Sequence, residues 1–476
     1  MSMYAVAAGH SLTAQTAAEV LENGGNAYDA AVAAAFVQPL AEPVLASLGG
    51  GGLLIAREPD GRTTFYDFFA AMPGRCGAPG AAGETVEVRV DYGGAVGVYH
   101  AGAASVAVPG LLRGLLALHA ARGKLPLARL VAPAVHAART GVPLSPLQAY
   151  LFTLIEPILT LTPEARALFA PRGRLLSAGD PLQNPDYAAF LERLPREGAG
   201  AFYAGATAAR LVAYLQERGG RLTADDLAGF QTLEAPARVF EQSPAALRFS
   251  PGPSLGGVAV AELLAAYLEG PHRHENEPRH YLGLAHAMQH VAESQGHRRG
   301  TTHLSVRDGE GRLLAMTVTN GEGSGLVAPG TGIFLNNILG EDDVVPAGRP
   351  LPRPGTRLVS MMAPVLLETG EDVYALGSGG SRRIRTAVFQ VAAHLLTGFA
   401  DLPGAVRAPR VHYENGRLEA EPGLDPSTLQ RLEREFELNL WPRKDFYFGG
   451  VHAVALNGQA AGDPRREGRV AGSSGS

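Results

Sequence analysis

Two adjacent threonines, Thr301 and Thr302, follow Gly300 where a polar segment gives way to a strand-like one. A threonine hydroxyl inside a chain is a weak nucleophile because no base is attached to it. If the Gly300–Thr301 peptide bond breaks, Thr301 gains a free α-amine close to its own hydroxyl. Such an amine titrates near ~8 and can act as the general base. The sequence therefore predicts a nucleophile made by self-cleavage, although Thr-Thr is also typical of an ordinary strand start.

A predicted hairpin follows these threonines. The runs His303–Val306 and Leu313–Thr319 are separated by an Asp-Gly turn signal. We expect the hairpin to return Thr319 beside Thr301, where its hydroxyl can hydrogen-bond the nucleophile. The next residue, Asn320, is a candidate for binding a polar group of a substrate.

A glycine-rich run provides a second candidate site. Gly377-Ser378-Gly379-Gly380 follows a predicted strand, Val373–Leu376, and precedes a predicted helix, Ile384–Gly398. Backbone N–H groups in such a layout can point at an anion. The spacing matches neither the Walker nor the dinucleotide glycine pattern. An oxyanion hole for a tetrahedral acyl intermediate at Gly379 and Gly380 fits better, and a plain tight turn is the alternative.

Composition narrows the class of protein. The 476 residues are 46% hydrophobic and 18% charged, which is typical of a globular protein with a large core. The net charge of −5, without a block of Lys or Arg, argues against nucleic-acid or membrane partners. The start has no secretory-signal pattern, so we expect a cytoplasmic protein. The single Cys76 excludes an internal disulfide. His286 and His290 lack an obvious acidic third ligand, so we expect no metal and no cofactor.

The predicted elements form one continuous α/β pattern. Residues 11–38 predict a helix that Gly24-Gly25-Asn26 interrupts, and 108–290 are mostly helical. From 301 onward strands dominate. Further expected helices are Leu111–Ala121, Leu127–Thr140, Thr207–Glu217, Ala224–Gly229 and Val258–Leu268; further expected strands are Leu53–Ala56, Thr63–Phe68, 363–369, 372–376, 411–419 and 451–456. No linker separates the halves, so we expect a single domain.

Several motifs occur together in a characteristic order. They are Asn23-Gly24-Gly25-Asn26-Ala27-Tyr28-Asp29-Ala30-Ala31, Glu42-Pro43, Gly49–Gly52, Val108-Pro109-Gly110, Phe202-Tyr203-Ala204-Gly205, Pro253-Ser254-Leu255-Gly256-Gly257, Thr301-Thr302-His303-Leu304-Ser305, Pro329–Asn337, Ala408-Pro409-Arg410 and Asp463-Pro464-Arg465. Over nearly the whole chain this order resembles the gamma-glutamyltransferase family of N-terminal nucleophile hydrolases.

The resemblance implies a four-layer αββα sandwich and autoproteolysis into segments 1–300 and 301–476 that stay associated and together form one domain. It implies that Thr301 is the nucleophile, that Thr319 supports it, and that Gly379 and Gly380 stabilise the oxyanion. The implied substrate is a γ-glutamyl compound such as glutathione or another small amide, with water, an amino acid or a peptide as acceptor. Further oligomerisation is left open.

The chain departs from the family where the glutamyl group is recognised. Phe69 stands at the position of the arginine that usually clamps the α-carboxylate. Of the usual groups that meet the α-amine, only Glu341 is kept, and Ser360 is the one serine left of a usual pair. Loss of a charged clamp leaves a substrate charge unpaired, which costs several kcal/mol.

Three functions are therefore open. The first is a gamma-glutamyltransferase or glutathione hydrolase with altered contacts. The second is an acylase or amidase of the cephalosporin-acylase kind, which the apolar Phe69, Ile338 and Met361 favour. The third is a processed but inactive relative.

Overall fold

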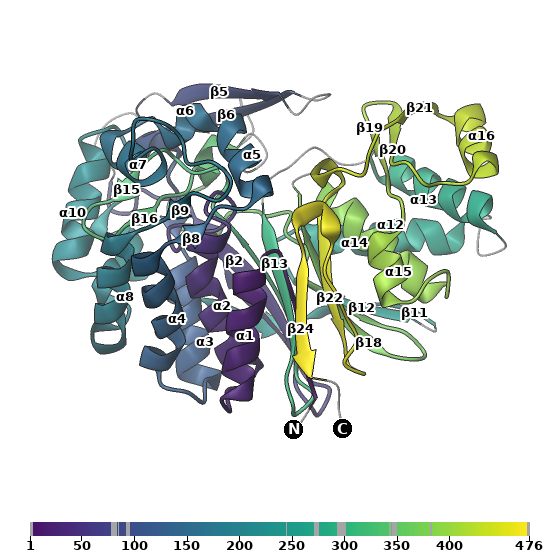
Figure 1. The fold of residues 1–476 in the computed structure, drawn as a ribbon, viewed down its shortest axis with the longest axis horizontal. Helices are drawn as coiled ribbons and strands as arrows, with labels where there is room; N and C mark the ends of the chain where they lie inside the picture. Colours follow the sequence, from purple (N-terminus) through teal and green to yellow (C-terminus); the bar gives the residue numbers. More distant parts are fainter. Residues whose placement is uncertain are drawn as a thin grey trace.

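Two antiparallel β-sheets face each other at the centre of the protein, as a computed structural model shows (Figure 1). The structure describes residues 3–77, 83, 85–91, 96–243, 245–270, 276–292, 301–341, 344, 350–380 and 383–473. The predicted mixed α/β class is confirmed.

The first sheet has seven strands in the order β10-β3-β2-β14-β13-β1-β24. Their bounds are β10 Leu233–Pro236, β3 Thr63–Phe68, β2 Gly51–Arg57, β14 Leu313–Thr319, β13 Thr302–Arg307, β1 Tyr4–Ala8 and β24 Arg469–Ser473. Strands from both ends of the chain lie side by side here, since β1 pairs with β24 on one side and β13 on the other.

The second sheet has six strands in the order β11-β12-β17-β18-β22-β23. Their bounds are β11 Arg238–Gln242, β12 Ala245–Phe249, β17 Val365–Glu368, β18 Val373–Gly379, β22 Gly450–Ala455 and β23 Ala460–Ala461. Strands β18 and β22 pack against β13 of the first sheet, so the first strand of the predicted hairpin faces the second sheet.

Helices cover the outer face of each sheet (Figure 1). On the first sheet they are α1 Ser11–Glu22, α2 Ala27–Ala41 and α3 Leu111–Arg122; α4 Leu127–Thr140 packs on α2, and α8 Pro185–Glu197 packs on α4. On the second sheet they are α12 Gly256–Glu269, α14 Ile384–Leu396 and α15 Leu402–Arg407, and α13 Glu277–Ala292 packs on α12. Helix α2 can be buried on nearly every side because its alanines let neighbouring elements approach closely.

Smaller elements complete the described chain. They are α5 Pro146–Leu154, α6 Glu156–Leu159, α7 Pro163–Phe169, α9 Gly200–Tyr203, α10 Gly205–Gln216, α11 Ala224–Gly229, α16 Pro426–Glu435, β4 Ala70–Ala71, β5 Val86–Asp91, β6 Val96–Ala101, β7 Val108–Pro109, β8 Val142–Pro143, β9 Pro181–Leu182, β15 Val327–Ala328, β16 Ile333–Phe334, β19 Val411–Glu414, β20 Arg417–Ala420 and β21 Glu437–Leu440. No helix in the described ranges is both long and apolar enough to cross a membrane.

The strongest sequence patterns are confirmed within a few residues. Asn26 caps α2, and its side chain forms a reciprocal capping box with Asp29, which explains why helical structure restarts after the two glycines. The strand expected over 411–419 is instead a hairpin, because Asn415 and Gly416 adopt positive φ and turn the chain. Helix α13, Glu277–Ala292, lies almost wholly within the stretch 108–290 that was expected to be mostly helical, although it was not predicted as a separate helix.

The glycine run before β2 allows close backbone packing. A Cβ atom on Gly50 would lie 2.0 Å from the carbonyl oxygen of Thr319, and one on Gly51 would lie 1.8 Å from that of Phe69. Because these glycines have no side chains, the backbones of Thr319 and Phe69 can lie directly against the start of β2, next to the end of β14.

We expect Gly51→Ala to destabilise the fold by about 1–3 kcal/mol or more, because the colliding atom is backbone and cannot rotate away. The measurement is the midpoint of urea unfolding. Gly200→Ala is the matched control, since no atom lies within 4 Å of its added methyl group. Equal midpoints for the two variants would contradict this account of β2.

Candidate active site

The hairpin β13–β14 places Thr301 and Thr319 at the same end of the sheet. Thr302 pairs with Val318, so Thr301, one residue before β13, lies opposite Thr319, the last residue of β14. Thr301 is 1% exposed and Thr319 is 4% exposed. The Thr319 hydroxyl accepts a hydrogen bond from the Gly321 N–H at 2.9 Å, which orients it at the strand end. Gly300, the other half of the predicted cleavage site, lies outside the described residues.

Strand β18 presents a face without side chains to β13. A Cβ atom on Gly377 would lie 2.2 Å from the His303 ring, and one on Gly379 would lie 2.1 Å from the Thr301 carbonyl oxygen. The predicted strand end at Leu376 is wrong: β18 continues to Gly379 and stays paired with β22. The glycine run is thus first a strand that allows close contact and only then a turn, since Gly380 has a φ of 122°.

A neutral histidine lies in β13, two residues after Thr301. His303 is fully buried and contacts the hydroxyls of Thr317 through Nδ1 at 2.7 Å and of Ser305 through Nε2 at 2.9 Å. Burial lowers the pKa of His303 well below its ordinary value, and His452 adds to the effect. An uncharged ring bridging two strands is suited to holding the hairpin, and the sequence analysis assigned it no role.

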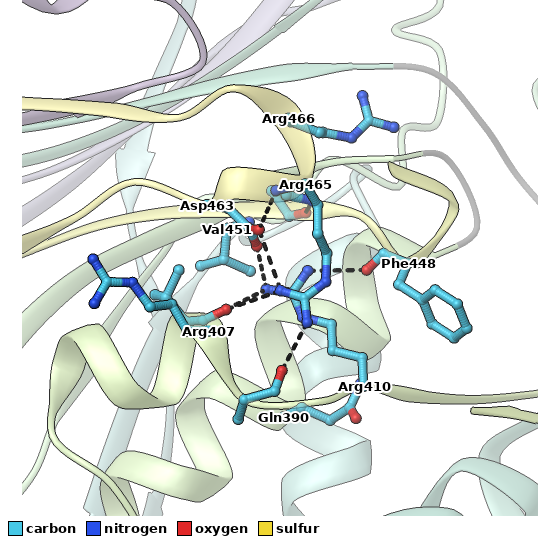
Figure 2. Close-up of polar contacts among 12 residues, drawn as sticks. Gln390, Arg407, Arg410, Phe448, Val451, Asp463, Arg465 and Arg466 are labelled. Atoms are coloured by element: carbon cyan, nitrogen blue, oxygen red, sulfur yellow. Dashed lines mark hydrogen bonds and ion pairs between the residues drawn. The ribbon is translucent and has the colours of Figure 1, made fainter. Parts of the chain in front are cut away.

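A buried ionic network holds the C-terminal segment around Asp463, which lies near Gly379 and Gly380 (Figure 2). Asp463 pairs with both Arg410 and Arg465 and accepts the Val451 N–H at 2.9 Å. Burial raises the pKa of Asp463, but the two guanidinium groups outweigh it and bring the pKa to about 2. The motifs Ala-Pro-Arg and Asp-Pro-Arg are therefore two halves of one structural network. Arg465 also pairs with the buried Glu421.

The next residue, Arg466, points away from this network (Figure 2). A Cβ atom on Gly379 would lie 3.3 Å from its Nη1 atom, and one on Gly380 would lie 3.3 Å from its Nη2 atom. A guanidinium group is thus held beside the two glycines expected to form the oxyanion site. Sequence reasoning missed Arg466, although it directly follows a quoted motif.

Glu42 is a second residue to which sequence reasoning gave no role. It lies beside Thr302, whose hydroxyl donates to Glu42 Oε1 at 2.6 Å. The Glu-Pro motif was the available signal, yet nothing in the sequence placed Glu42 next to the Thr301-Thr302 pair. The structure brings the two together because α2 packs on β13.

The expected substrate-binding residues divide into two groups. Asn320 is fully buried and its Oδ1 has no hydrogen-bond partner among the described residues. A Cβ atom on the following Gly321 would lie 2.6 Å from Glu341 Oε1. These polar groups therefore gather just after Thr319. The Ser360 hydroxyl instead accepts the Met362 N–H at 3.1 Å, which is a local turn contact.

Phe69 lies in the apolar core between the sheets. It is 3% exposed and belongs to one hydrophobic cluster with Ile338, Leu358 and Met362. Its carbonyl oxygen is the atom that Gly51 accommodates, and Gly51 pairs with Thr319. The position at which the resemblance predicts a carboxylate-binding arginine, Phe69, is thus apolar and lies close to the end of β14.

The described residues hold no group of three or more His, Cys, Asp or Glu side chains placed to bind a metal. His286 instead contacts Glu435 at 2.8 Å on the surface. Cys76 is exposed.

The chain is similar in sequence and in fold to several known proteins. A family described as Gamma-glutamyltranspeptidase matches residues 13–297 and 271–473. The acylase ACY 1 proenzyme of Pseudomonas sp. (strain V22) is 31% identical over 504 residues, covering 95% of this chain and 89% of that protein. The glutathione hydrolase proenzyme of Pseudomonas aeruginosa is 31% identical over 479 residues, covering 86% and 83%. A cephalosporin acylase from Bacillus halodurans shares the fold, with a TM-score of 0.82 at 21% identity over 99% of this chain and 96% of that one.

We expect Asp463→Asn to lower the free energy of unfolding by about 3–5 kcal/mol, because two buried guanidinium groups lose their shared carboxylate. The pKa of Asp463 in the folded state, about 2, lies below that of an unfolded aspartate, about 3.9. Its stabilisation is therefore present above about pH 4 and lost as the pH falls toward 2. Urea unfolding between pH 7 and pH 2 measures both effects.

The exposed pair Glu87–Arg89 supplies the control, since Glu87→Gln should leave the unfolding midpoint unchanged. An Asp463→Asn protein as stable as the wild type at pH 7 would contradict a structural role for the network.

Proposed function

The chain belongs to the gamma-glutamyltranspeptidase family of N-terminal nucleophile hydrolases, and from that premise we propose that it is a self-processing acylase whose acyl group is not γ-glutamyl. The observation that carries this proposal is Phe69, an apolar residue packed with Ile338 and Met362 where the family resemblance places a carboxylate-binding arginine. Helices on the outer faces of two facing sheets support a four-layer αββα sandwich.

Self-cleavage would begin at the Thr301 hydroxyl. Its oxygen attacks the Gly300 carbonyl carbon, and the hydroxyl proton passes to the Thr301 nitrogen as the peptide bond breaks. The resulting ester joins Gly300 to the Thr301 oxygen. Water then cleaves this ester, which leaves a carboxylate on Gly300 and a free amine and hydroxyl on Thr301. Segments 1–300 and 301–476 would stay associated because β13 and β14 pair within a sheet that also holds β1 and β2.

Acyl transfer would use the same hydroxyl. The Thr301 amine removes the hydroxyl proton as the oxygen attacks the substrate amide, and it returns the proton to the leaving amine. Thr319, opposite Thr301 in the extended register, orients the hydroxyl. The backbone at Gly379 and Gly380 and the Arg466 guanidinium stabilise the negative charge that develops on the amide oxygen. Water or an amine then takes the acyl group from Thr301.

The acyl group would be apolar or weakly charged near the bond that is cleaved. The similarity to an acylase proenzyme supports this reading, and so does the absence of the family arginine at Phe69. Hydrolysis of glutathione or transfer of its γ-glutamyl group is the second candidate. Asn320 and Glu341, which gather just after Thr319, favour it because they could meet an α-amine.

Thr301→Ala should remain one chain of 49.7 kDa and turn over no amide, because it lacks the attacking oxygen. Thr301→Ser should still cleave and turn over, more slowly. Denaturing electrophoresis with intact-mass spectrometry follows the cleavage. Thr153→Ala, which removes an exposed hydroxyl on α5, should process like the wild type. An uncleaved wild-type protein, or a cleaved and active Thr301→Ala, would refute the assignment.

A set of acyl anilides tests specificity. We expect a neutral acyl anilide to exceed the γ-glutamyl anilide in kcat/KM by roughly tenfold or more, because an unpaired substrate charge at the apolar cluster is costly. The glutaryl anilide, which keeps the carboxylate but lacks the α-amine, should lie between them. Preferred turnover of the γ-glutamyl anilide, reduced by Glu341→Gln, would support the second candidate instead. A cleaved protein that turns over none of the anilides would be the inactive relative.

A further inference from the structure

Glu42 occupies a closed site between the helix layer and the first sheet. It is the C-cap residue of α2 and only 2% exposed. Gly9, which follows β1, lies against it: a Cβ atom there would be 2.3 Å from Glu42 Oε1 and 3.0 Å from Thr302 Oγ1. The absence of a side chain at position 9 therefore makes room for the contact between this carboxyl group and Thr302.

The carboxyl group is tied to the residue next to the nucleophile. Thr302 donates its hydroxyl to Oε1 at 2.6 Å, and Thr13 of α1 donates to Oε2 at 3.4 Å. Adjacent strand residues point to opposite faces. The Thr302 side chain thus anchors the start of β13 to the helices, while Thr301 faces the second sheet and the Gly379 backbone.

Burial of Glu42 allows its carboxyl group to change protonation near neutrality. Burial raises the pKa of Glu42 to about 7, against the hydrogen bonds from Thr302 and Thr13 and the positive charge of Arg466, which lower it. Glu467 raises it further, and His10 in turn feels the charge of Glu467. The ionised form makes the stronger, charge-assisted bond to the Thr302 hydroxyl.

Arg466 connects the two sides of the nucleophile. Its guanidinium lies beside Gly379 and Gly380 and acts electrostatically on Glu42. A negative carboxylate on the helix side of Thr302 and a positive guanidinium on the glycine side thus bracket the start of β13. Glu42 and Arg466 are both far from β13 in the sequence, so only the tertiary packing brings them to the start of this strand.

We propose that Glu42 is a positioning residue for both self-cleavage and acyl transfer: its carboxylate holds the Thr302 hydroxyl and so fixes the Thr301 amine and hydroxyl against the glycines of β18. This inference rests on the proposed function of Thr301. A small displacement of a nucleophile is costly, since misplacement by about 1 Å lowers rates by roughly 100-fold. One hydrogen bond to the neighbouring residue therefore has a measurable effect on rate.

Glu42→Gln is the direct test because it keeps the shape and cannot ionise. We expect self-cleavage and kcat to fall by roughly 10- to 100-fold with little change in KM, because positioning rather than substrate binding is lost. In the wild type, kcat should rise with pH through about 7 as Glu42 ionises, and this component should be absent from Glu42→Gln. The later rise from the Thr301 amine, near ~8, should remain.

Thr302 variants separate positioning from general stability. Thr302→Val should reproduce the loss seen with Glu42→Gln, Thr302→Ser should restore most of the rate, and the double variant Glu42→Gln/Thr302→Val should be no slower than either single variant. Thr16 is a buried threonine of α1, and Thr16→Val is the control for loss of a buried hydroxyl. Its rate of self-cleavage should be within about twofold of that of the wild type. Thermal unfolding of each variant tracks the fold itself.

The outcomes distinguish this inference from the proposed function. If the wild type cleaves and turns over substrate while Glu42→Gln matches it in cleavage rate, kcat and pH profile, only the role of Glu42 is overturned. A loss that is additive with Thr302→Val and follows the melting temperature would likewise overturn it in favour of a structural role. A wild type that neither cleaves nor turns over any amide overturns both.

Discussion

The approach of β18 to β13 across the two sheets is the constraint on which the site depends. Gly377 and Gly379 alternate along β18 and so present bare backbone on one face, against the His303 ring and the Thr301 carbonyl oxygen. Any side chain at these positions would separate the sheets beside Thr301. The same glycines that suggest an oxyanion hole in the sequence therefore first serve to let the two sheets meet.

Polar groups buried around this contact are closely paired. His303 stays neutral between two hydroxyls, and Asp463 is shared by Arg410 and Arg465. Burying such groups is costly unless their hydrogen bonds are satisfied. The network around Asp463 holds the turn that precedes Arg466. The same buried ions therefore position the positive charge of Arg466 beside Gly379 and Gly380.

The two halves of the site have different chemical character. Around Thr301 the groups are polar and precisely supported, as an acyl-transfer reaction requires. Around Phe69 the core is apolar, and Ile338 and Met362 complete it. Similarity to both an acylase and a glutathione hydrolase is consistent with our proposal that the nucleophile is shared and the acyl-binding region has changed.

Local pattern was enough to predict much of this protein. The bounds of α4, α11 and β14 were predicted from hydrophobic periodicity and turn residues, and the Thr301–Thr319 juxtaposition from a hairpin whose strands pair in register. The full length of β18 was not predictable, because glycines are poor strand formers and only pairing with β22 keeps Gly379 extended.

The tertiary structure alone brought Glu42 to Thr302 and Arg466 to the glycines. These residues are separated from their partners by long stretches of chain, and their contacts arise from the packing of α2 on β13 and from the buried ion network. Sequence by itself thus determined the family and the nucleophile candidate, and it predicted that Phe69 stands where the family has a charged clamp. Packing decided which charges surround that nucleophile, because charge acts through space and not along the chain.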